Sequence, residues 1–435
     1  MYKPLLLSLI LVALSIFSTT AQIKNIKLDE AAAGSYPPSE PSIAINLNDI
    51  DNIVAAAILD KVYTTKDGGK SWTKKRLKSS YGVYGDPAVI SSAYGCFYYF
   101  HLSDPSGKGW QGEEILDRMV VQKSKNGGVK WNNGYSIGLN HPKDQDKEWP
   151  AINQKNGNIY LTWTQFDKYG SKEASDKSNI LFSKSTEGGK NWSAPIAINE
   201  LQGDCIDDDK TVEGAVPTVG PNGEIYVAWS YDDKIYFDRS VDEGTTWLEK
   251  DVEVANQIGG WALDIPGINR CNGMPITICD VSNSPYNGTI YVNYADQTNG
   301  EDDTDIWLVK STDKGATWSA PKRVNDDKTG KQQFLTWMSI DQTTGYIYIV
   351  FYDRRNHEDL NTDVYLAYST DGGETFINKK ISESPFIPSG DVFFGDYTNI
   401  AAHKGRICPV WTKMDDGKTS IWTAVISEGD LGIER

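Results

Sequence analysis

Short runs of apolar residues, separated by polar turns that contain glycine, recur along most of the chain. One kind of run, as in "NILFSKS", "DIWLVKS" and "DVYLAYS", leads directly into a turn such as "KSTDKGATW" (310–318). A second kind lies upstream, as in "EIYVAWSYD", and a third lies earlier still, as in "YGDPAVI" and "EWPAI". No helical period separates these runs, so the pattern predicts an all-β protein.

The turn phrase is itself repeated. It has a hydroxyl residue, an acid or amide two positions later, a glycine two further on, and an aromatic ring three beyond that. The six copies begin at Thr65, Ser124, Ser185, Ser240, Ser311 and Ser369. Self-similarity of this kind is the signature of a repeat architecture, in which each copy marks one supersecondary unit.

Each position of the phrase has a physical role. The acid accepts hydrogen bonds from backbone N–H groups of a tight turn, and the glycine supplies a positive φ. The ring covers apolar space between neighbouring sheets. The phrase resembles the Asp-box, or BNR repeat, of the sialidase-like β-propellers. Chain direction places these turns on the rim opposite the candidate site, so their five acids and one amide are expected to be structural, with a calcium or catalytic role as the alternative: Asp67, Asn126, Glu187, Asp242, Asp313 and Asp371.

The three runs and the strand after the turn make four strands per unit, which is the blade of a propeller. Counting second strands gives the number of blades. They begin near Asn52, Cys96, Asn158, Glu224, Thr289, Tyr346 and Arg406. We therefore predict a seven-bladed β-propeller, with six blades, as in well-known sialidases, as the alternative. The seventh unit has no turn phrase, so "IKNIKLD" (23–29) is expected to supply its outer strand.

The N-terminus has the features of an export signal. One lysine precedes an apolar run from Leu5 to Phe17, and small residues follow up to Ala21. This predicts a signal peptide over residues 1–21, too short for a comfortable membrane span. Residues 22–435 are then expected to form a single propeller domain that is secreted or periplasmic, with no later membrane span.

Charge and cysteine content narrow the partners. The formal net charge is −16, which argues against nucleic acid because phosphate binding draws on clustered Lys and Arg. Five cysteines cannot all pair within one chain. One disulfide can form among Cys205, Cys271 and Cys279, whereas Cys96 and Cys408 lie in apolar strands and are expected to be buried thiols.

Candidate chemistry gathers at one face. If the third strand runs down into the repeated turn, the first strands begin, and the second strands end, on the opposite face, here called the upper face. Acids head the first strands at Glu40, Asp86, Glu148, Glu213 and Asp396. Because strand starts converge on the axis, these carboxyls are expected to crowd and to push their pKa values apart, as acid–base cleavage of a glycosidic bond requires. Capping of strands and loops is the alternative role for each acid.

The resemblance to sialidases assigns roles to some of these residues. Sialidases cut terminal sialic acids with a Tyr nucleophile helped by a Glu, an Asp acid/base, and three arginines on the substrate carboxylate. "VEGAVPTVGPNGEIYVAW" is similar to the segment around that Glu and implies Glu213, and "GDYTNIAAHKGRI" is similar to the segment around that Tyr and implies Tyr397. "YGDPAVI" offers Asp86 as the acid/base, with Glu148 as the other candidate.

The arginines match less well. The family has an arginine on its first inner strand, where this chain has Glu40 in "SEPSI". Arg270, Arg354 and Arg355 remain as an anion clamp, since paired guanidinium groups suit a carboxylate. Salt bridges at strand ends are the competing role for the three.

These expectations lead to a carbohydrate-active protein, first a sialidase-like glycoside hydrolase with Tyr397, Glu213, Asp86 and Glu148 as catalytic residues. The substrate-binding set is Arg270, Arg354, Arg355, Trp149, Trp261, Trp337 and Asp396. Two other functions stay open: a non-catalytic glycan- or protein-binding propeller, and a lyase on uronic-acid polymers that uses Tyr397 or Tyr84 with His101.

No cofactor is predicted. The four histidines are not spaced as a zinc site. The acidic stretches "DCIDDD" (204–209) and "GEDDTD" (300–305) are interpreted as solvated loops, with structural Ca²⁺ as the alternative.

Overall fold

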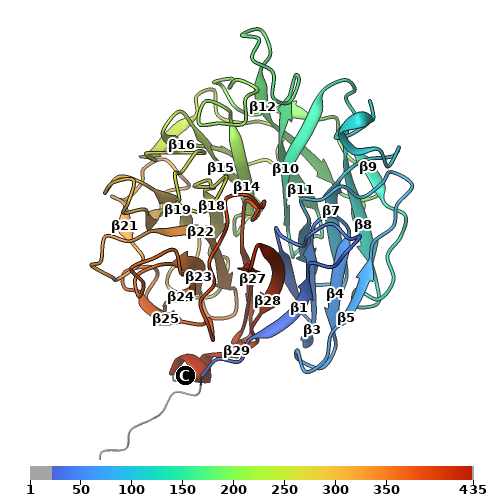
Figure 1. Cartoon of the computed structure of the whole chain (residues 1–435). Coiled ribbons are helices and arrows are strands. Elements are labelled where there is room, and N and C mark those ends of the chain that lie inside the picture. The colour runs from blue at the N-terminus through green and yellow to red at the C-terminus, as the bar shows by residue number, and fades with distance from the viewer. Residues whose placement is uncertain (1–21, 434–435) are drawn as a thin grey trace, which may run out of the picture.

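The structure is a computed structural model that describes residues 22–433, so the predicted signal peptide lies outside the described residues. Seven antiparallel sheets stand around one axis (Figure 1). The fold is a seven-bladed β-propeller, as predicted, and helix is limited to the 3-10 turn η1 (Gly109–Gln111) and α1 (Glu428–Leu431) within the described chain.

The blades are numbered in chain order, and their strands run from the axis outward. Blade 1 holds β2 (Ser42–Asn46), β3 (Asp49–Ala57), β4 (Lys61–Thr65) and β5 (Thr73–Arg76). Blade 2 holds β6 (Ala88–Ser91), β7 (Phe97–Leu102), β8 (Met119–Ser124) and β9 (Tyr135–Ile137). Blade 3 holds β10 (Asp144–Ile152), β11 (Ile159–Phe166), β12 (Ser178–Ser185) and β13 (Ile196–Ala197).

The second half follows the same plan. Blade 4 holds β14 (Glu213–Val219), β15 (Ile225–Tyr231), β16 (Lys234–Ser240) and β17 (Val252–Asn256). Blade 5 holds β18 (Ile276–Cys279), β19 (Ile290–Asp296), β20 (Asp305–Ser311) and β21 (Lys322–Arg323). Blade 6 holds β22 (Gln333–Asp341), β23 (Tyr346–Asp353), β24 (Asp363–Ser369) and β25 (Ile377–Lys380).

Blade 7 closes the ring with both ends of the chain. It holds β26 (Asn399–His403), β27 (Arg406–Asp415), β28 (Lys418–Thr423) and, outermost, β1 (Ile26–Glu30). The short β29 (Ile426–Ser427) also pairs with β27. Strand β1 runs antiparallel to β28, with Ile26 opposite Thr423, and Figure 1 shows the blue N-terminal strand beside the red C-terminal ones. The expected closure by the segment at 23–29 is confirmed.

The six repeated turns have nearly one geometry. In the last, the Ser369 hydroxyl donates to Asp371, whose carboxylate accepts from the N–H and the hydroxyl of Thr375. The glycines have positive φ throughout, for example 80° at Gly373. The turn at Glu187 departs from the others, because its longer side chain accepts from Asn191 and from no backbone N–H.

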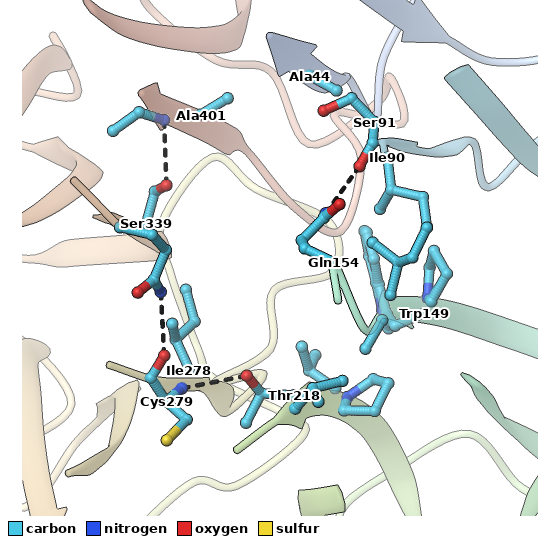
Figure 2. A pocket seen from close by; sticks show the side chains of 18 of the residues that line it. Ala44, Ile90, Ser91, Trp149, Gln154, Thr218, Ile278, Cys279, Ser339 and Ala401 are labelled. Atoms are coloured by element: carbon cyan, nitrogen blue, oxygen red, sulfur yellow. Dashed lines mark hydrogen bonds between the residues drawn. The ribbon is translucent and has the colours of Figure 1, made fainter. Parts of the chain in front are cut away.

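Inner strands belong to separate sheets, and side chains join them around the axis. Figure 2 shows Gln154 donating to the carbonyl of Ser91 and the N–H of Cys279 donating to the Thr218 hydroxyl. Similar side-chain to backbone bonds cross from Ala402 to Ser339, from Ile43 to Asn399 and from Val89 to Ser42. The polar side chains of the channel wall are therefore used to hold blades together.

The hollow part of the channel is a cavity of about 500 Å³. It runs from Trp149 and Trp337 along the inner strands to Gln154, Gln342 and His403 near their ends. In blade 1, Ile45 near the end of the inner strand pairs with Ile53, which pairs with Thr65 at the repeated turn. The cavity thus lies on the side of the repeated turns, whereas the upper-face end of the channel is filled by side chains.

All five cysteines are free thiols, so the disulfide considered for Cys205, Cys271 and Cys279 is not formed. Cys408 is buried as expected, but Cys96 is only partly buried. None of the helices described is long and apolar enough to span a membrane.

Candidate active site

The inner strands begin with an unusual backbone. Glu40, Asp86, Lys147 and Leu335 have φ between 46° and 54°, and Gly214 has φ 73°. Register shifts between the paired residues Asp146 and Trp149, and at the same place in β14 and β22, mark the β-bulges that this conformation produces. Left-handed backbone at non-glycine residues is uncommon and is concentrated at functional sites. Here it directs acids into the end of the channel.

Nine ionisable residues gather there and are called the acid cluster. Seven are acids and two are cations: Glu40, Asp86, Asp146, Glu148, Asp207, Glu213, Asp396, Lys147 and Arg270. Five of the acids were expected from the heads of the inner strands. Asp146, Asp207 and Lys147 were not.

Lys147 is the first centre of the cluster. Its buried ammonium lies 3.0 Å from Asp86, 3.0 Å from Asp396 and 3.7 Å from Asp146. Burial alone lowers the pKa of this ammonium, but Asp146, Asp86 and Asp396 outweigh burial, and the net pKa is well above its usual value. Lys147 is therefore a fixed positive charge beneath three carboxylates.

Arg270 is the second centre. Its Nε donates to Asp396 at 2.9 Å and its Nη1 donates to Asp207 at 2.6 Å, while Nη2 also donates to Asp396. The hydroxyl of Tyr169 donates to the same oxygen of Asp207. Burial raises the pKa of Asp396, but Arg270 and then Lys147 lower it to about 2. Asp396 is thus the carboxylate that both cations share.

Glu148 and Glu213 are different in kind. Their side chains are 1% and 0% exposed, and neither carboxyl has a hydrogen-bond partner within residues 22–433. Burial raises both pKa values well above normal; the next cause is Asp86 for Glu148 and Asp207 for Glu213. In each case burial favours the protonated form, and an aspartate that is paired with a cation lies beside it.

Tyr397 lies next to the cluster, and no hydrogen bond joins its hydroxyl to Glu213. Its ring packs against Trp149 and Trp337, with centroids 5.0 and 6.1 Å away. Its hydroxyl has no hydrogen-bond partner in the described chain. Burial, followed by Asp86 and Glu40, raises its pKa well above normal, so the hydroxyl is protonated and is not activated by a base.

The tryptophans expected to hold sugars are buried. Trp149 and Trp337 pack on each other at the inner end of the cavity. Trp261 packs over Gly214 and donates its indole N–H to Asp207 at 3.0 Å. In this structure the three rings support the cluster from within and do not present faces to the upper surface.

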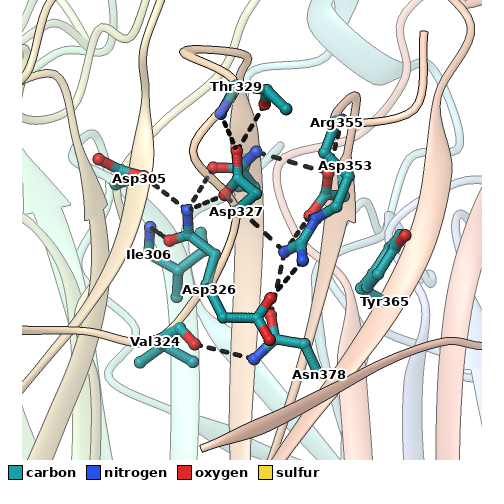
Figure 3. Close-up of polar contacts among 12 residues, drawn as sticks. Asp305, Ile306, Val324, Asp326, Asp327, Thr329, Asp353, Arg355, Tyr365 and Asn378 are labelled. Atoms are coloured by element: carbon teal, nitrogen blue, oxygen red, sulfur yellow. Dashed lines mark hydrogen bonds and ion pairs between the residues drawn. The ribbon is translucent and has the colours of Figure 1, made fainter.

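The structure does not assemble the three-arginine clamp. Arg270 is in the acid cluster, whereas Arg354 is buried over Phe334 and donates to the Pro266 carbonyl at 2.7 Å. Arg355 pairs with Asp353 and Asp326 and lies over the Tyr365 ring (Figure 3). The guanidinium groups have separate partners because Arg354 and Arg355 extend from the end of β23 into contacts with blades 5 and 6.

Residues expected for other chemistry also have structural surroundings. His101 is buried, its Nδ1 lies 2.7 Å from the Leu102 carbonyl, and burial lowers its pKa to about 4. No hydrogen bond or ring contact joins it to Tyr397 or Tyr84. The acidic stretch at 204–209 is not simply solvated, because Asp207 is buried against Arg270. No group of three or more His, Cys, Asp or Glu side chains within residues 22–433 is arranged to hold a metal ion.

Aromatic residues surround the cluster at the upper surface, and the sequence reasoning missed them. Trp110 in η1 stacks on Tyr169, with ring centroids 5.4 Å apart. Phe393 lies under the Arg270 guanidinium at 5.4 Å. Tyr36 is half exposed, and burial, Glu40 and Asp86 raise its pKa. All four lie in loops outside the repeat, which is the one signal that sets them apart in the sequence.

Comparison with known proteins supports the fold and says little about function. No family model matches the chain, and no curated protein matches it. Among solved structures, an ulvan lyase of a polysaccharide lyase family, bound to a GlcA–Rha3S repeat, has a TM-score of 0.55 at 12% identity, over 92% of this chain and 96% of that one.

Two further structures have the same general shape. The intramolecular trans-sialidase from Ruminococcus gnavus, in complex with oseltamivir carboxylate, has a TM-score of 0.51 at 11% identity, over 82% of this chain and 97% of that one. A protein of unknown function from Dyadobacter fermentans has a TM-score of 0.51 at 14% identity, over 93% and 99% of the two chains. At these identities the likeness shows the fold alone: the chain has propeller neighbours that include sialidases and a polysaccharide lyase.

Proposed function

We propose that the protein is a secreted or periplasmic glycoside hydrolase that acts at the acid cluster. The observation that carries the proposal is the contrast between neighbouring carboxyls. Glu148 is buried without a hydrogen-bond partner, and burial raises its pKa well above normal, while Asp86 beside it forms an ion pair with Lys147. A carboxyl that favours its protonated form, next to a carboxylate in an ion pair, suits acid–base cleavage of a glycosidic bond.

In this scheme Glu148 is the general acid and Asp86 is the base or nucleophile. Asp86 is the more accessible of the two, with a side chain 13% exposed, and Lys147 keeps a positive charge 3.0 Å from it. Glu148 gives its proton to the leaving oxygen as the bond breaks. An unpartnered buried carboxyl is costly to fold, and a catalytic role explains why one is kept here.

Glu213 provides a second acid with the same surroundings on the Arg270 side of the cluster. It is buried next to Asp207, which pairs with Arg270, and burial followed by Asp207 raises its pKa well above normal. The resemblance to sialidases assigns catalysis to Glu213, whereas exposure favours the Glu148–Asp86 pair. We therefore propose the Glu148–Asp86 pair as the reacting pair and Glu213 as a positioning residue.

The test is turnover on a broad panel of glycans. Glu148→Gln keeps the shape of a protonated carboxyl but cannot donate a proton, so turnover is expected to fall by about 10²- to 10⁴-fold. The melting temperature should stay near that of the wild type, because no ion pair is lost. Glu253→Gln, at an exposed glutamate on β17, is the matched control.

The outcomes separate the alternatives. Hydrolysis in heavy-oxygen water places the label in the product, whereas a lyase gives an unsaturated product that absorbs in the ultraviolet. Turnover that survives in Glu148→Gln and is lost in Glu213→Gln would move the acid role to Glu213. Binding without turnover across the panel would replace this proposal with a glycan-binding propeller.

A further inference from the structure

One aromatic platform lies beside the acid cluster on the upper face. Among the tryptophans of the described chain, Trp110 alone is exposed, at 59%. Its ring is stacked on Tyr169 with an angle of 29° between the planes, so one indole face is held by protein and much of the rest meets solvent. An exposed large ring on a rigid support is typical of a binding surface.

The platform is joined to the cluster through one residue. Tyr169 holds Trp110 by stacking, and its hydroxyl donates to Asp207 and lies 3.4 Å from Nη1 of Arg270. Phe166 also packs edge-on against Tyr169, with centroids 5.1 Å apart. A ring lying on Trp110 would therefore be placed next to the group that reaches Asp207 and Arg270.

The cations of the cluster are already neutralised. Arg270 gives Nε and Nη2 to Asp396 and Nη1 to Asp207. Lys147 is buried among Asp86, Asp396 and Asp146. Four acids, Asp86, Asp146, Asp207 and Asp396, face these two cations, so the pocket has no spare positive charge for an anionic sugar. The net charge of −16 for the whole chain opposes anions further.

We propose that this site takes an uncharged oligosaccharide, with one sugar ring stacked on Trp110 and the next ring over the acid cluster. The position of the ring over the acid cluster rests on the proposed function, whereas the position of the other ring rests on the exposure and stacking of Trp110. It separates this protein from neighbours whose ligands, oseltamivir carboxylate and a glucuronate-containing repeat, carry carboxylates.

Two lysines near the platform could favour anions, and they do not change the inference. Lys108 and Lys168 adjoin Trp110 and Tyr169 in sequence, and both are exposed. Exposed charges are screened by water and salt and contribute little to binding. The ring that reacts must lie over the carboxylates of the cluster, which repel an anion at short range.

The experiment measures binding directly, by calorimetry, with neutral oligosaccharides of one to six sugars and with sialyllactose and oligogalacturonate as anionic probes. Wild-type protein is expected to bind at least one neutral series, with affinity rising from one sugar to two or more. Trp110→Ala should weaken that binding by about tenfold, and Trp110→Phe by less. Tyr94→Ala is the matched control, because Tyr94 is also exposed, at 65%, but lies in the β6–β7 hairpin on the opposite face.

Each outcome has one meaning. Binding of the anionic probes in preference to neutral ones, equal binding by Trp110→Ala and wild type, or no binding to any neutral series would overturn the inference. Neutral binding that depends on Trp110, without turnover, would leave the inference standing and remove the hydrolase proposal. Turnover of a neutral glycan with unchanged KM in Trp110→Ala would leave the hydrolase proposal standing and overturn the inference about Trp110.

Discussion

The rings of Trp149 and Trp337 meet across the axis of the propeller, with centroids 4.3 Å apart. They come from β10 in blade 3 and β22 in blade 6, so the contact joins opposite sides of the ring. Tyr397 packs against both. These rings separate the acid cluster on the upper face from the cavity on the side of the repeated turns.

Removing one ring should destabilise the protein. Trp337→Ala leaves a void between opposite blades, and we expect a loss of about 3–5 kcal/mol in the free energy of unfolding. Urea denaturation measures the loss. Trp110→Ala, at the exposed tryptophan, should change the midpoint little, and equal losses in the two variants would contradict this account of the Trp149–Trp337 contact.

Asp396 is expected to be the most sensitive acid of the cluster. Asp396→Asn leaves the buried Lys147 and the partly exposed Arg270 without their shared carboxylate. Breaking the buried pair with Lys147 costs about 3–5 kcal/mol. The folded pKa of about 2 lies below the usual 3.8, so the wild-type carboxylate stabilises the fold above about pH 4. That contribution is lost as the pH falls towards 2.

The control for Asp396→Asn is a substitution at a different aspartate that also pairs with an arginine. Asp326 pairs with Arg355, but its side chain is 55% exposed, so Asp326→Asn should cost no more than about 1 kcal/mol. Denaturation midpoints of the two variants at neutral pH make the comparison. A small loss for Asp396→Asn would mean that the cluster is more solvated than its burial indicates.

Glu213 should make stability fall as the pH rises. Its folded pKa lies well above the usual 4.5, so the folded protein binds this proton more tightly than the unfolded chain does. The stabilisation is full below about pH 4.5 and is lost as the pH rises towards the folded pKa. Glu213→Gln removes this dependence, so the variant should gain on the wild type between about pH 5 and about pH 8.

The measurement for Glu213 is the difference between the urea midpoints of variant and wild type at the two pH values. Glu253→Gln, at an exposed position, serves as the control, and its difference from wild type should not grow in the same way. A difference for Glu213→Gln that is the same at both pH values would show that Glu213 is not held protonated in the folded protein.

The geometry of the repeated turns predicts that two substitutions of Asp371 destabilise the protein to different extents. Asp371→Ala removes the acceptor of the Ser369 hydroxyl and of the N–H and hydroxyl of Thr375, and we expect a loss of about 1–2 kcal/mol. Asp371→Asn keeps one carbonyl acceptor, as Asn126 does in the second turn, and should lose less. Thermal melting ranks the two, and equal losses would contradict the role given to the acid.

Much of the fold was predictable because the repeat fixes it. Six of the seven second strands begin within one residue of the expected position, and the first begins at Asp49 instead of near Asn52. The turn at 184–192 shows the limit of the pattern. Glu187 matches the phrase by charge, but its extra methylene moves the carboxylate away from the backbone N–H groups that the shorter side chains reach.

The site was less predictable, because bulges decide which side chains face the axis. Alternation along a strand assigns faces only where the register is regular. In "DQDKEW", φ 54° at Lys147 breaks that alternation and puts Lys147 in the centre of the cluster. A lone lysine within a run of acids was the available signal. The stacking of Trp110 on Tyr169 joins two loops of different blades, and no periodicity connects them.

The pairing of β1 with β28 has a consequence for how the fold is completed. The two strands are separated by nearly the whole polypeptide, so the ring of blades cannot close during synthesis until the last blade has been made. After a single cut in an exposed loop of blades 2 to 6, the two fragments would then still be held together by the pairing of β1 with β28. Loss of residues 22–30 would instead leave blade 7 with a bare edge, free to pair with a strand from another molecule.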